Sequence, residues 1–134
     1  MKKIFIIIMM SLPLINYCQQ NDNEKYTAEG FYVTQIDING NEKELPYGKN
    51  VKIIYDTFFK SYDITFVARN GENWGWKLDY LGVFDNGIIK MKDHSGNIFT
   101  IIDFLKEKGT FAIMSEKDED GNIYLYHMKN AKRL

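Results

Sequence analysis

The feature that most constrains the fold is a series of short apolar runs separated by turn-forming dipeptides. The runs span residues 31–38, 51–55, 62–68, 74–84, 88–92, 98–105, 111–115 and 123–128. The dipeptides include Asn39-Gly40, Asn70-Gly71, Asn86-Gly87 and Asp120-Gly121. Such pairs favour tight hairpins because both residues tolerate positive φ. No later stretch keeps a helical apolar period, so the sequence predicts an all-β chain of about eight strands, with at most one helical turn at 106–108.

Alternation within the runs indicates how the strands pack. Tyr62, Ile64 and Phe66 share one face of their strand, whereas Asp63 and Thr65 share the other. Period two with one polar face is typical of a half-buried antiparallel sheet. Sequential strands joined by short turns form a meander, and closure removes its edges. We therefore expect an up-and-down antiparallel barrel or a strongly curved sheet, and the turns leave a two-sheet β-sandwich open as the alternative.

Three local features depart from simple alternation. In the first run Phe31 and Val33 share a face but Ile36 falls on the other, which predicts a β-bulge near Thr34 or Gln35. Pro46 is expected in a connecting loop. The run 98–105 is apolar on both faces, so we expect one face to lie under a loop or to meet a partner.

The N-terminus has the features of a secretory signal peptide. Lys2 and Lys3 precede an apolar run over residues 4–15, and polar residues follow. A membrane-spanning helix needs about 20 apolar residues, and this run is shorter. We expect a signal peptide over residues 1–17 and an extracytoplasmic protein, whether periplasmic, secreted or lipid-anchored in a bacterial envelope.

The end of the signal leaves two alternatives open at Cys18. Cleavage before Cys18 would let it carry lipid, and Ile15 suits that pattern, but Tyr17 stands where a small residue is usual. Cleavage after Cys18 would give a protein without an anchor. In either case residues 18–28 are expected to be a flexible polar segment, and residues 29–134 a single β domain.

The composition limits which partners the protein can bind and whether it can form disulfide bonds. Acidic residues slightly outnumber basic ones, 18 to 17, and no basic cluster occurs, so nucleic-acid binding is not expected. Cys18 is the only cysteine, so no internal disulfide can form. Membrane contact is expected only through the signal peptide or a lipidated Cys18, and no cofactor is expected.

One face of the predicted sheet is rich in aromatic residues and is the candidate ligand site. Its residues are Tyr62, Phe66, Trp74, Trp76, Tyr80 and Phe84. The interior of an eight-stranded barrel is either filled by side chains or holds one small ligand. Aromatic rings could line such a cavity, or they could fill the core, and both readings remain open.

The remaining polar motifs are interpreted as turns. Asp93, His94 and Ser95 are adjacent, and neighbouring residues of a turn point in different directions, so they do not make a catalytic triad. Residues 118–122 resemble part of a calcium loop but lack its ligand spacing and distal Glu. His127 stands alone on its strand, so no metal site and no enzyme activity are predicted.

Gly30-Phe31-Tyr32 resembles the start of the first strand in lipocalin-like proteins, which has the pattern Gly, any residue, Trp. Tyr32 takes the place of the Trp. The resemblance implies a small barrel in which this aromatic closes one end. There it would pack beside a basic residue near the chain end, which could be Lys129, Lys132 or Arg133. It also implies ligand binding, although a shared fold does not fix function.

Two functions follow as hypotheses. The first is an exported binding module for a small apolar or aromatic ligand, based on the aromatic face. The alternative is an extracytoplasmic protein-interaction, inhibitor or immunity-type protein without enzymatic activity, which would bind an envelope protein. It is based on the two-faced run 98–105 and predicts an exposed apolar patch.

Overall fold

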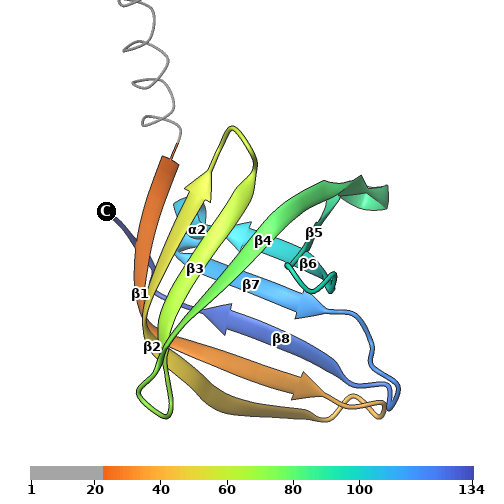
Figure 1. The fold of residues 1–134 in the computed structure, drawn as a ribbon. Coiled ribbons are helices and arrows are strands. Elements are labelled where there is room, and N and C mark those ends of the chain that lie inside the picture. Colours follow the sequence, from red (N-terminus) through yellow and green to blue (C-terminus); the bar gives the residue numbers. More distant parts are fainter. Residues whose placement is uncertain (1–22) are drawn as a thin grey trace, which may run out of the picture.

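From β1 to β7, each strand of the barrel pairs antiparallel with the strand that follows it (Figure 1). The computed structural model describes residues 23–134, so the expected signal peptide and Cys18 lie outside the described residues. The strands are β1 (Asn23–Ile36), β2 (Glu42–Asp56), β3 (Ser61–Ala68), β4 (Asn73–Phe84), β5 (Ile88–Lys92), β6 (Ile98–Phe104), β7 (Thr110–Ser115), β8 (Ile123–Met128) and the short β9 (Lys132–Arg133). Because β1 pairs with both β2 and β8, the sheet closes. The predicted up-and-down barrel is confirmed, and the sandwich alternative is excluded.

β1 is the strand that closes the barrel, and it is longer than predicted. Its first half pairs with β9, where Tyr26 lies opposite Arg133, and its second half pairs with β8, where Tyr32 lies opposite His127. The expectation of a flexible segment at 18–28 is wrong from residue 23 onward. Tyr26 is only 2% exposed and Ala28 is buried, so this polar-looking stretch alternates and packs.

The irregularities of β1 and β2 differ from those predicted. Residues 34–36 of β1 pair without interruption, so the bulge expected near Thr34 or Gln35 is absent there. The buried residues Ala28 and Phe31 are three positions apart, so the alternation reverses between them. A shift of register then occurs where Phe31 pairs with Gly48 and Tyr32 with Pro46.

Pro46 lies within β2 and not in a loop. It sits at the register shift, and β3 pairs with β2 only from Gly48 onward. Residues 42–46 therefore have β1 as their only paired neighbour. Proline, which has no N–H to donate, is tolerated at such an edge or irregularity.

Phe84 also departs from the prediction, because β4 shifts register between Tyr80 and Gly82. Tyr80 pairs with Met91 and Phe84 pairs with Ile88. These two β5 residues are an odd number of positions apart, so they face opposite sides of the sheet. Met91 is buried inside, and Phe84 therefore faces outward.

The run 98–105 ends in a single helical turn, as predicted. α2 (Leu105–Lys108) follows β6 and ends at Gly109, whose φ of 68° is the left-handed cap conformation that favours glycine. Phe99 and Ile101 of β6 are buried inside the barrel, and Leu105 is buried at the start of α2. The other face of β6 remains exposed.

Three turns at one end of the barrel repeat one arrangement. Asp37, Asp93 and Asp118 each begin a turn with the pattern Asp-x-x-Gly-Asn. In each turn one carboxylate oxygen of the aspartate accepts the backbone N–H groups two and four residues later. The glycines have φ between 82° and 86°, which explains why Gly occupies that position.

The core occupies the barrel interior along its whole length. Its fully buried residues include Phe31, Ile53, Ile64, Leu78, Met91, Phe111, Ile113 and Met128. They come from seven of the strands, so no single hairpin can bury its apolar face alone. No helix among residues 23–134 is long and apolar enough to cross a membrane.

Candidate functional site

Two of the predicted site residues, Phe66 and Trp76, belong to one interior cluster of aromatic rings. Phe66 packs edge-on against Phe31, with ring centroids 5.0 Å apart. Trp76 packs edge-on against Tyr126 at 5.0 Å and against Phe99 at 5.1 Å. These contacts cross the barrel from β4 to β6 and β8. The rings therefore fill this section of the interior.

The other predicted site residues lie elsewhere. Tyr62 is buried nearer the opposite end, 4.6 Å from Tyr55 and 4.9 Å from Phe111 between ring centroids. Tyr80 is half-buried, and Phe84 faces outward. Trp74 is on the inner face but is 52% exposed at the barrel mouth. The six residues thus do not form one site.

Sequence analysis missed four members of the interior cluster, namely Phe31, Tyr47, Phe99 and Tyr126. Tyr47 packs against Phe31, Phe66 and Tyr126 at centroid distances of 5.4, 5.4 and 5.2 Å. Pro46 predicts a loop at this point of the chain, and a loop residue is not expected in the core. Alternation within their own strands marks Phe99 and Tyr126 as residues of one face, but it does not show which rings meet across the barrel.

A hydrogen-bonded pair, the buried Tyr62 and the exposed Asp103, lies near the first turn of α2. The Tyr62 hydroxyl donates a hydrogen bond to Oδ2 of Asp103 at 2.6 Å. The other Asp103 oxygen accepts the backbone N–H of Leu105 at 2.9 Å. Burial, and then the hydrogen bond to Asp103, raise the pKa of Tyr62 well above its ordinary value. Tyr62 therefore acts as a neutral hydrogen-bond donor.

Asp93 and His94 lie in the β5–β6 turn. The Asp93 carboxylate accepts N–H groups from Ser95 and Asn97. Burial alone would raise the pKa of Asp93, but the hydrogen bonds from Asn97 and Ser95 outweigh it and lower that pKa. The carboxylate thus stabilises its own turn.

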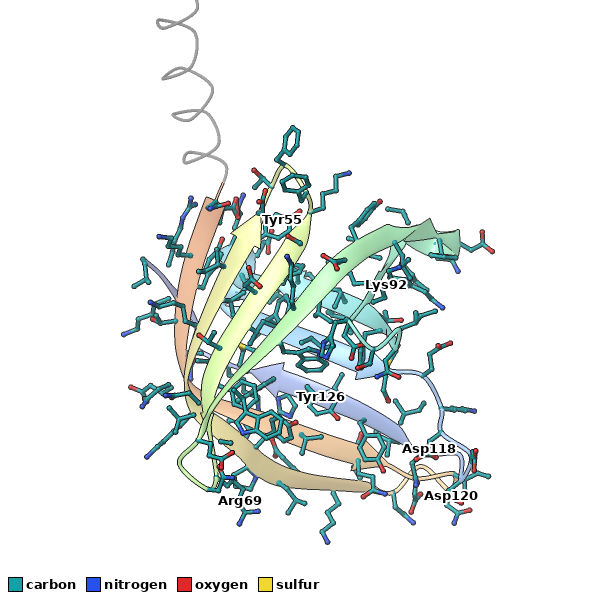
Figure 2. The ribbon with its side chains drawn as sticks, in the orientation of Figure 1. Tyr55, Arg69, Lys92, Asp118, Asp120 and Tyr126 are labelled. Carbon is teal, nitrogen blue, oxygen red and sulfur yellow. The ribbon has the colours of Figure 1, made fainter. Side chains whose placement is uncertain are left out.

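The acidic residues of the β7–β8 turn lie at the end of the barrel opposite Tyr55 (Figure 2). Oδ1 of Asp118 accepts the backbone N–H groups of Asp120 and Asn122, both at 2.9 Å. Among residues 23–134, no group of three or more His, Cys, Asp or Glu side chains is placed to hold a metal ion.

His127 lies on the outer face of β8. Its Nε2 atom is 3.1 Å from Oγ1 of Thr34 and 3.2 Å from Oε1 of Glu44. Burial lowers the pKa of His127, Glu44 raises it and Lys129 lowers it, and the net direction is downward. The histidine is therefore held by neighbouring strands as a neutral bridge.

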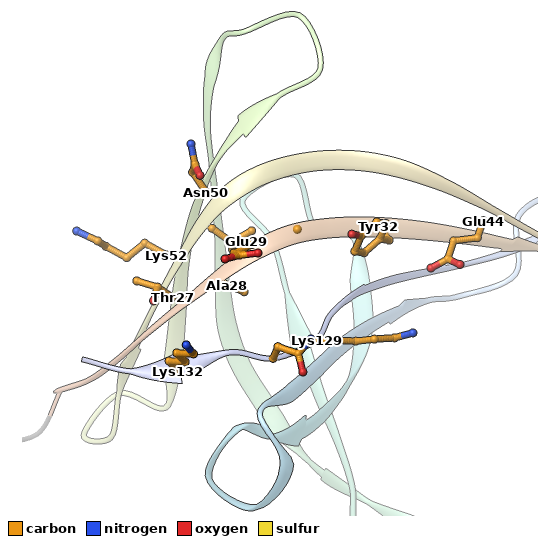
Figure 3. Close-up of a pocket in the computed structure, with 12 residues that line it drawn as sticks. Thr27, Ala28, Glu29, Tyr32, Glu44, Asn50, Lys52, Lys129 and Lys132 are labelled. Atoms are coloured by element: carbon orange, nitrogen blue, oxygen red, sulfur yellow. The ribbon is translucent and has the colours of Figure 1, made fainter.

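Tyr32 also lies on this outer face, with its ring centroid 5.8 Å from that of His127. It borders an open hollow of about 750 Å³ on the outside of β1 and β2. Lys129 and Lys132 line the same hollow, but Figure 3 shows the lysine side chains of Lys52 and Lys129 pointing in opposite directions. The lysines therefore do not converge on one anion, and Phe31, not Tyr32, is the interior aromatic.

The outer faces of β6, β7 and β8 form a continuous apolar surface. We define the apolar wall as Thr100, Ile102, Ala112, Met114, Ile123 and Leu125. Cross-strand pairing joins Ile102 to Ala112, and joins Met114 to both Thr100 and Leu125. Their strand neighbours Ile101 and Ile113 are buried inside, so alternation directs the wall residues outward.

The opposite side of the barrel is charged on its outer face. Asp63 of β3 pairs with Lys77 of β4, and Asp79 of β4 pairs with Lys92 of β5. In contrast, no Lys, Arg, Asp or Glu faces outward from β6, β7 or β8. The wall residue Ile102 is 39% exposed, and the other wall residues are half-buried.

Comparison with known proteins returned no match: no family model, no curated protein sequence and no solved structure matches this chain.

Proposed function

We propose that this chain is an extracytoplasmic binding protein of lipocalin-like architecture that docks on another envelope protein through its apolar wall. The supporting observation is the contrast between the uncharged outer faces of β6 to β8 and the paired charges outside β3 and β4. A water-facing sheet normally carries polar residues on its outer face. An apolar face rimmed by polar residues marks a binding surface.

The location in this proposal comes from the N-terminal sequence. Lys2 and Lys3 followed by the apolar residues 4–15 support export. A partner is therefore sought among proteins of the envelope or the exterior. Docking requires shape and apolar contact, and it makes no demand for a catalytic group.

Substitutions in the wall test this function. We would replace Ile102 and Leu125 by lysine, because a charge at the centre of an apolar interface weakens binding. The matched control is Val67→Lys, an apolar residue on the outer face of β3. The bait is the chain from Gln19 onward, which contains every described strand.

The expected result is capture of a specific envelope protein by the wild type and by Val67→Lys, and loss of that protein with Ile102→Lys/Leu125→Lys. Circular dichroism would verify that all three fold. Equal capture by the wall variant and the wild type would overturn the proposal, as would the absence of any specific partner.

A second candidate function is the binding of a small apolar or aromatic ligand at the barrel mouth. The observation that favours it is the placement of Trp74, which is 52% exposed beside the half-buried Trp76. Exposed indole rings offer stacking surfaces to such a ligand. Rings fill the interior beneath them, so the ligand would rest at the mouth.

Tryptophan fluorescence tests this candidate directly, because Trp74 and Trp76 are the only tryptophans of the chain. Titration with the apolar probe anilinonaphthalene sulfonate should quench both the wild type and Trp76→Phe, and should leave Trp74→Phe unchanged. Equal quenching of Trp74→Phe would place the probe elsewhere and reject this site.

A further inference from the structure

The exposed phenylalanines gather at one end of the barrel. Among residues 23–134, Phe31, Phe66, Phe99 and Phe111 are buried. The exposed ones are Phe58, Phe59, Phe84 and Phe104. They lie in or beside the β2–β3, β4–β5 and β6–β7 connections, which share one end in an up-and-down barrel (Figure 1). We call this the aromatic end.

The β2–β3 turn holds two of these rings in a fixed outward position. Oδ1 of Asp56 accepts the backbone N–H groups of Phe58 at 2.9 Å and Phe59 at 3.1 Å. The two rings pack edge-on against each other at 4.9 Å and are 71% and 69% exposed. The turn therefore presents an ordered pair of rings to the exterior, and ordering them needs no further conformational change.

Lysines accompany the rings at this end. The Nζ atom of Lys90 lies 5.3 Å from the ring centroid of Phe84, and that of Lys108 lies 5.2 Å from the centroid of Phe104. Lys60 follows Phe59 directly and lies over the ring of Tyr80. Aromatic rings with adjacent lysines are typical of surfaces that enter the headgroup region of a bilayer.

Charge is distributed unequally between the two ends. At the aromatic end, residues 23–25, 56–60, 84–87, 103–108 and 129–134 contain seven basic and five acidic side chains. At the opposite end, residues 37–44 and 116–122 contain seven acidic and two basic side chains. An anionic lipid surface would attract the first end and repel the second, so it would orient the barrel.

The N-terminal strand enters at the aromatic end. Asn23 pairs with Asp56 at the base of the Phe58–Phe59 turn, and Glu24 forms a 3.0 Å ion pair with Lys106 of α2. Cys18 is five residues before Asn23, a reach of at most about 18 Å in an extended chain. A lipid on Cys18 would therefore bring this end, and no other, to the membrane.

We propose that the aromatic end binds anionic phospholipid bilayers, with Phe58 and Phe59 entering the headgroup region and Lys60 and Lys108 lying beside lipid phosphates. The apolar wall on the side of the barrel then stays free for a protein partner. This contact adds to the two membrane links expected from the sequence, the signal peptide and a lipidated Cys18, and requires neither.

Vesicle flotation tests the proposal with the chain from Gln19 onward, which carries no acyl group. Vesicles of phosphatidylglycerol and phosphatidylethanolamine should carry the wild type upward, and phosphatidylcholine vesicles should carry far less. Phe58→Ser/Phe59→Ser should lower partitioning into the anionic vesicles by about tenfold or more. Ile38→Ser is the matched control, because Ile38 is 76% exposed at the opposite end, and it should float like the wild type.

Charge variants separate attraction by lipid phosphate from simple apolar adhesion. Lys60→Gln/Lys108→Gln should reduce flotation with the anionic vesicles, whereas Lys43→Gln/Lys117→Gln at the opposite end should not. Failure of the wild type to float with anionic vesicles would overturn the proposal, and so would an equal loss with Ile38→Ser. A third result would also overturn the proposal. If the wild type self-associates without binding vesicles, and Phe58→Ser/Phe59→Ser abolishes that self-association, the rings bind a second copy of the chain. Ile102→Lys/Leu125→Lys should float normally, so the wall and this end can fail separately.

Discussion

The Tyr62 hydroxyl and the Asp103 carboxylate form a 2.6 Å hydrogen bond at one end of the barrel, between the start of β3 and the end of β6. These strands are not neighbours in the sheet. The bond therefore links two strands that do not pair with each other, across the end of the barrel. Tyr62 is 5% exposed, whereas Asp103 is exposed, so water can take the place of the Tyr62 hydroxyl at the carboxylate.

Replacing Tyr62 by phenylalanine should lower the free energy of unfolding by about 1–2 kcal/mol, because it removes a hydrogen bond to a charged group that water can still solvate. The ring contacts with Tyr55 and Phe111 remain, so the loss reports the hydroxyl. Urea unfolding followed by circular dichroism measures it. Tyr124→Phe, which removes the hydroxyl of a half-buried tyrosine near the other end, serves as the control. An unchanged midpoint for Tyr62→Phe would show that the bond contributes nothing net.

Alkaline pH should destabilise the protein through the same residue. The unfolded chain releases the Tyr62 proton near pH 10, whereas burial raises the pKa of Tyr62 in the folded chain. The folded state then binds more protons than the unfolded state, so the free energy of unfolding falls as the pH rises above about 10. Thermal melts between pH 8 and pH 11, values on either side of the ordinary tyrosine pKa, should show this decline. Tyr62→Phe should decline less steeply, and an equal slope would contradict the assignment.

The alternation of Tyr62, Ile64 and Phe66 was enough to predict β3 and its buried face, because period two depends only on neighbouring residues. The turns are predictable for the same reason, because the positive φ at Gly40 and Gly121 depends only on the residues of the turn itself. Bulges were not predictable. The orientation of Phe84 depends on a register shift against β5 that its own sequence does not contain.

The candidate surfaces are likewise predictable only where they depend on neighbouring residues. Apolar residues on both faces of 98–105 predict a face that is covered by a loop or meets a partner, and Ile102 on that face is 39% exposed. The wall as a whole depends on pairing Met114 with Leu125, a long-range relationship between strands. The filling of the interior likewise depends on Tyr47 and Tyr126 meeting across the barrel, which no local pattern reveals.

The β5–β6 turn should be more sensitive to loss of its aspartate than the β7–β8 turn. Asp93 is 9% exposed and also accepts a hydrogen bond from the Asn97 side chain, whereas Asp118 is exposed. We expect Asp93→Ala to cost about 1–2 kcal/mol and Asp118→Ala less than about 1 kcal/mol. Urea unfolding compares the two. Because the pKa of Asp93 is lowered on folding, its contribution should be lost as the pH falls below about 4. An equal loss of unfolding free energy in the two variants would show that the burial of Asp93 does not strengthen its contribution.

Mild acid should weaken the contact of β8 with β1 and β2. The pKa of His127 is lowered on folding, chiefly by burial, so the unfolded chain takes up a proton first as the pH falls through about 6.5. Stability should therefore decrease between pH 7 and pH 5. His127→Gln keeps a hydrogen-bonding group near Thr34 but does not titrate, so its stability should change less over this range. Melting temperatures across the range would measure the difference, and parallel curves would rule out His127 as the cause.

Two strand glycines provide a matched test of core packing. A Cβ atom added to Gly48 would lie 2.5 Å from the Phe66 ring and 2.9 Å from the carbonyl oxygen of Val67, whereas one added to Gly75 meets nothing within 4 Å. Neither glycine has a positive φ. Gly48→Ala must displace a ring that packs on Phe31, so it should destabilise by about 1–3 kcal/mol. Gly75→Ala should be neutral or stabilising by up to about 1 kcal/mol, because it restricts the unfolded chain. Urea unfolding of both variants decides the matter: if Gly48→Ala is as stable as Gly75→Ala, the close approach of β2 to the Phe66 ring does not constrain the core.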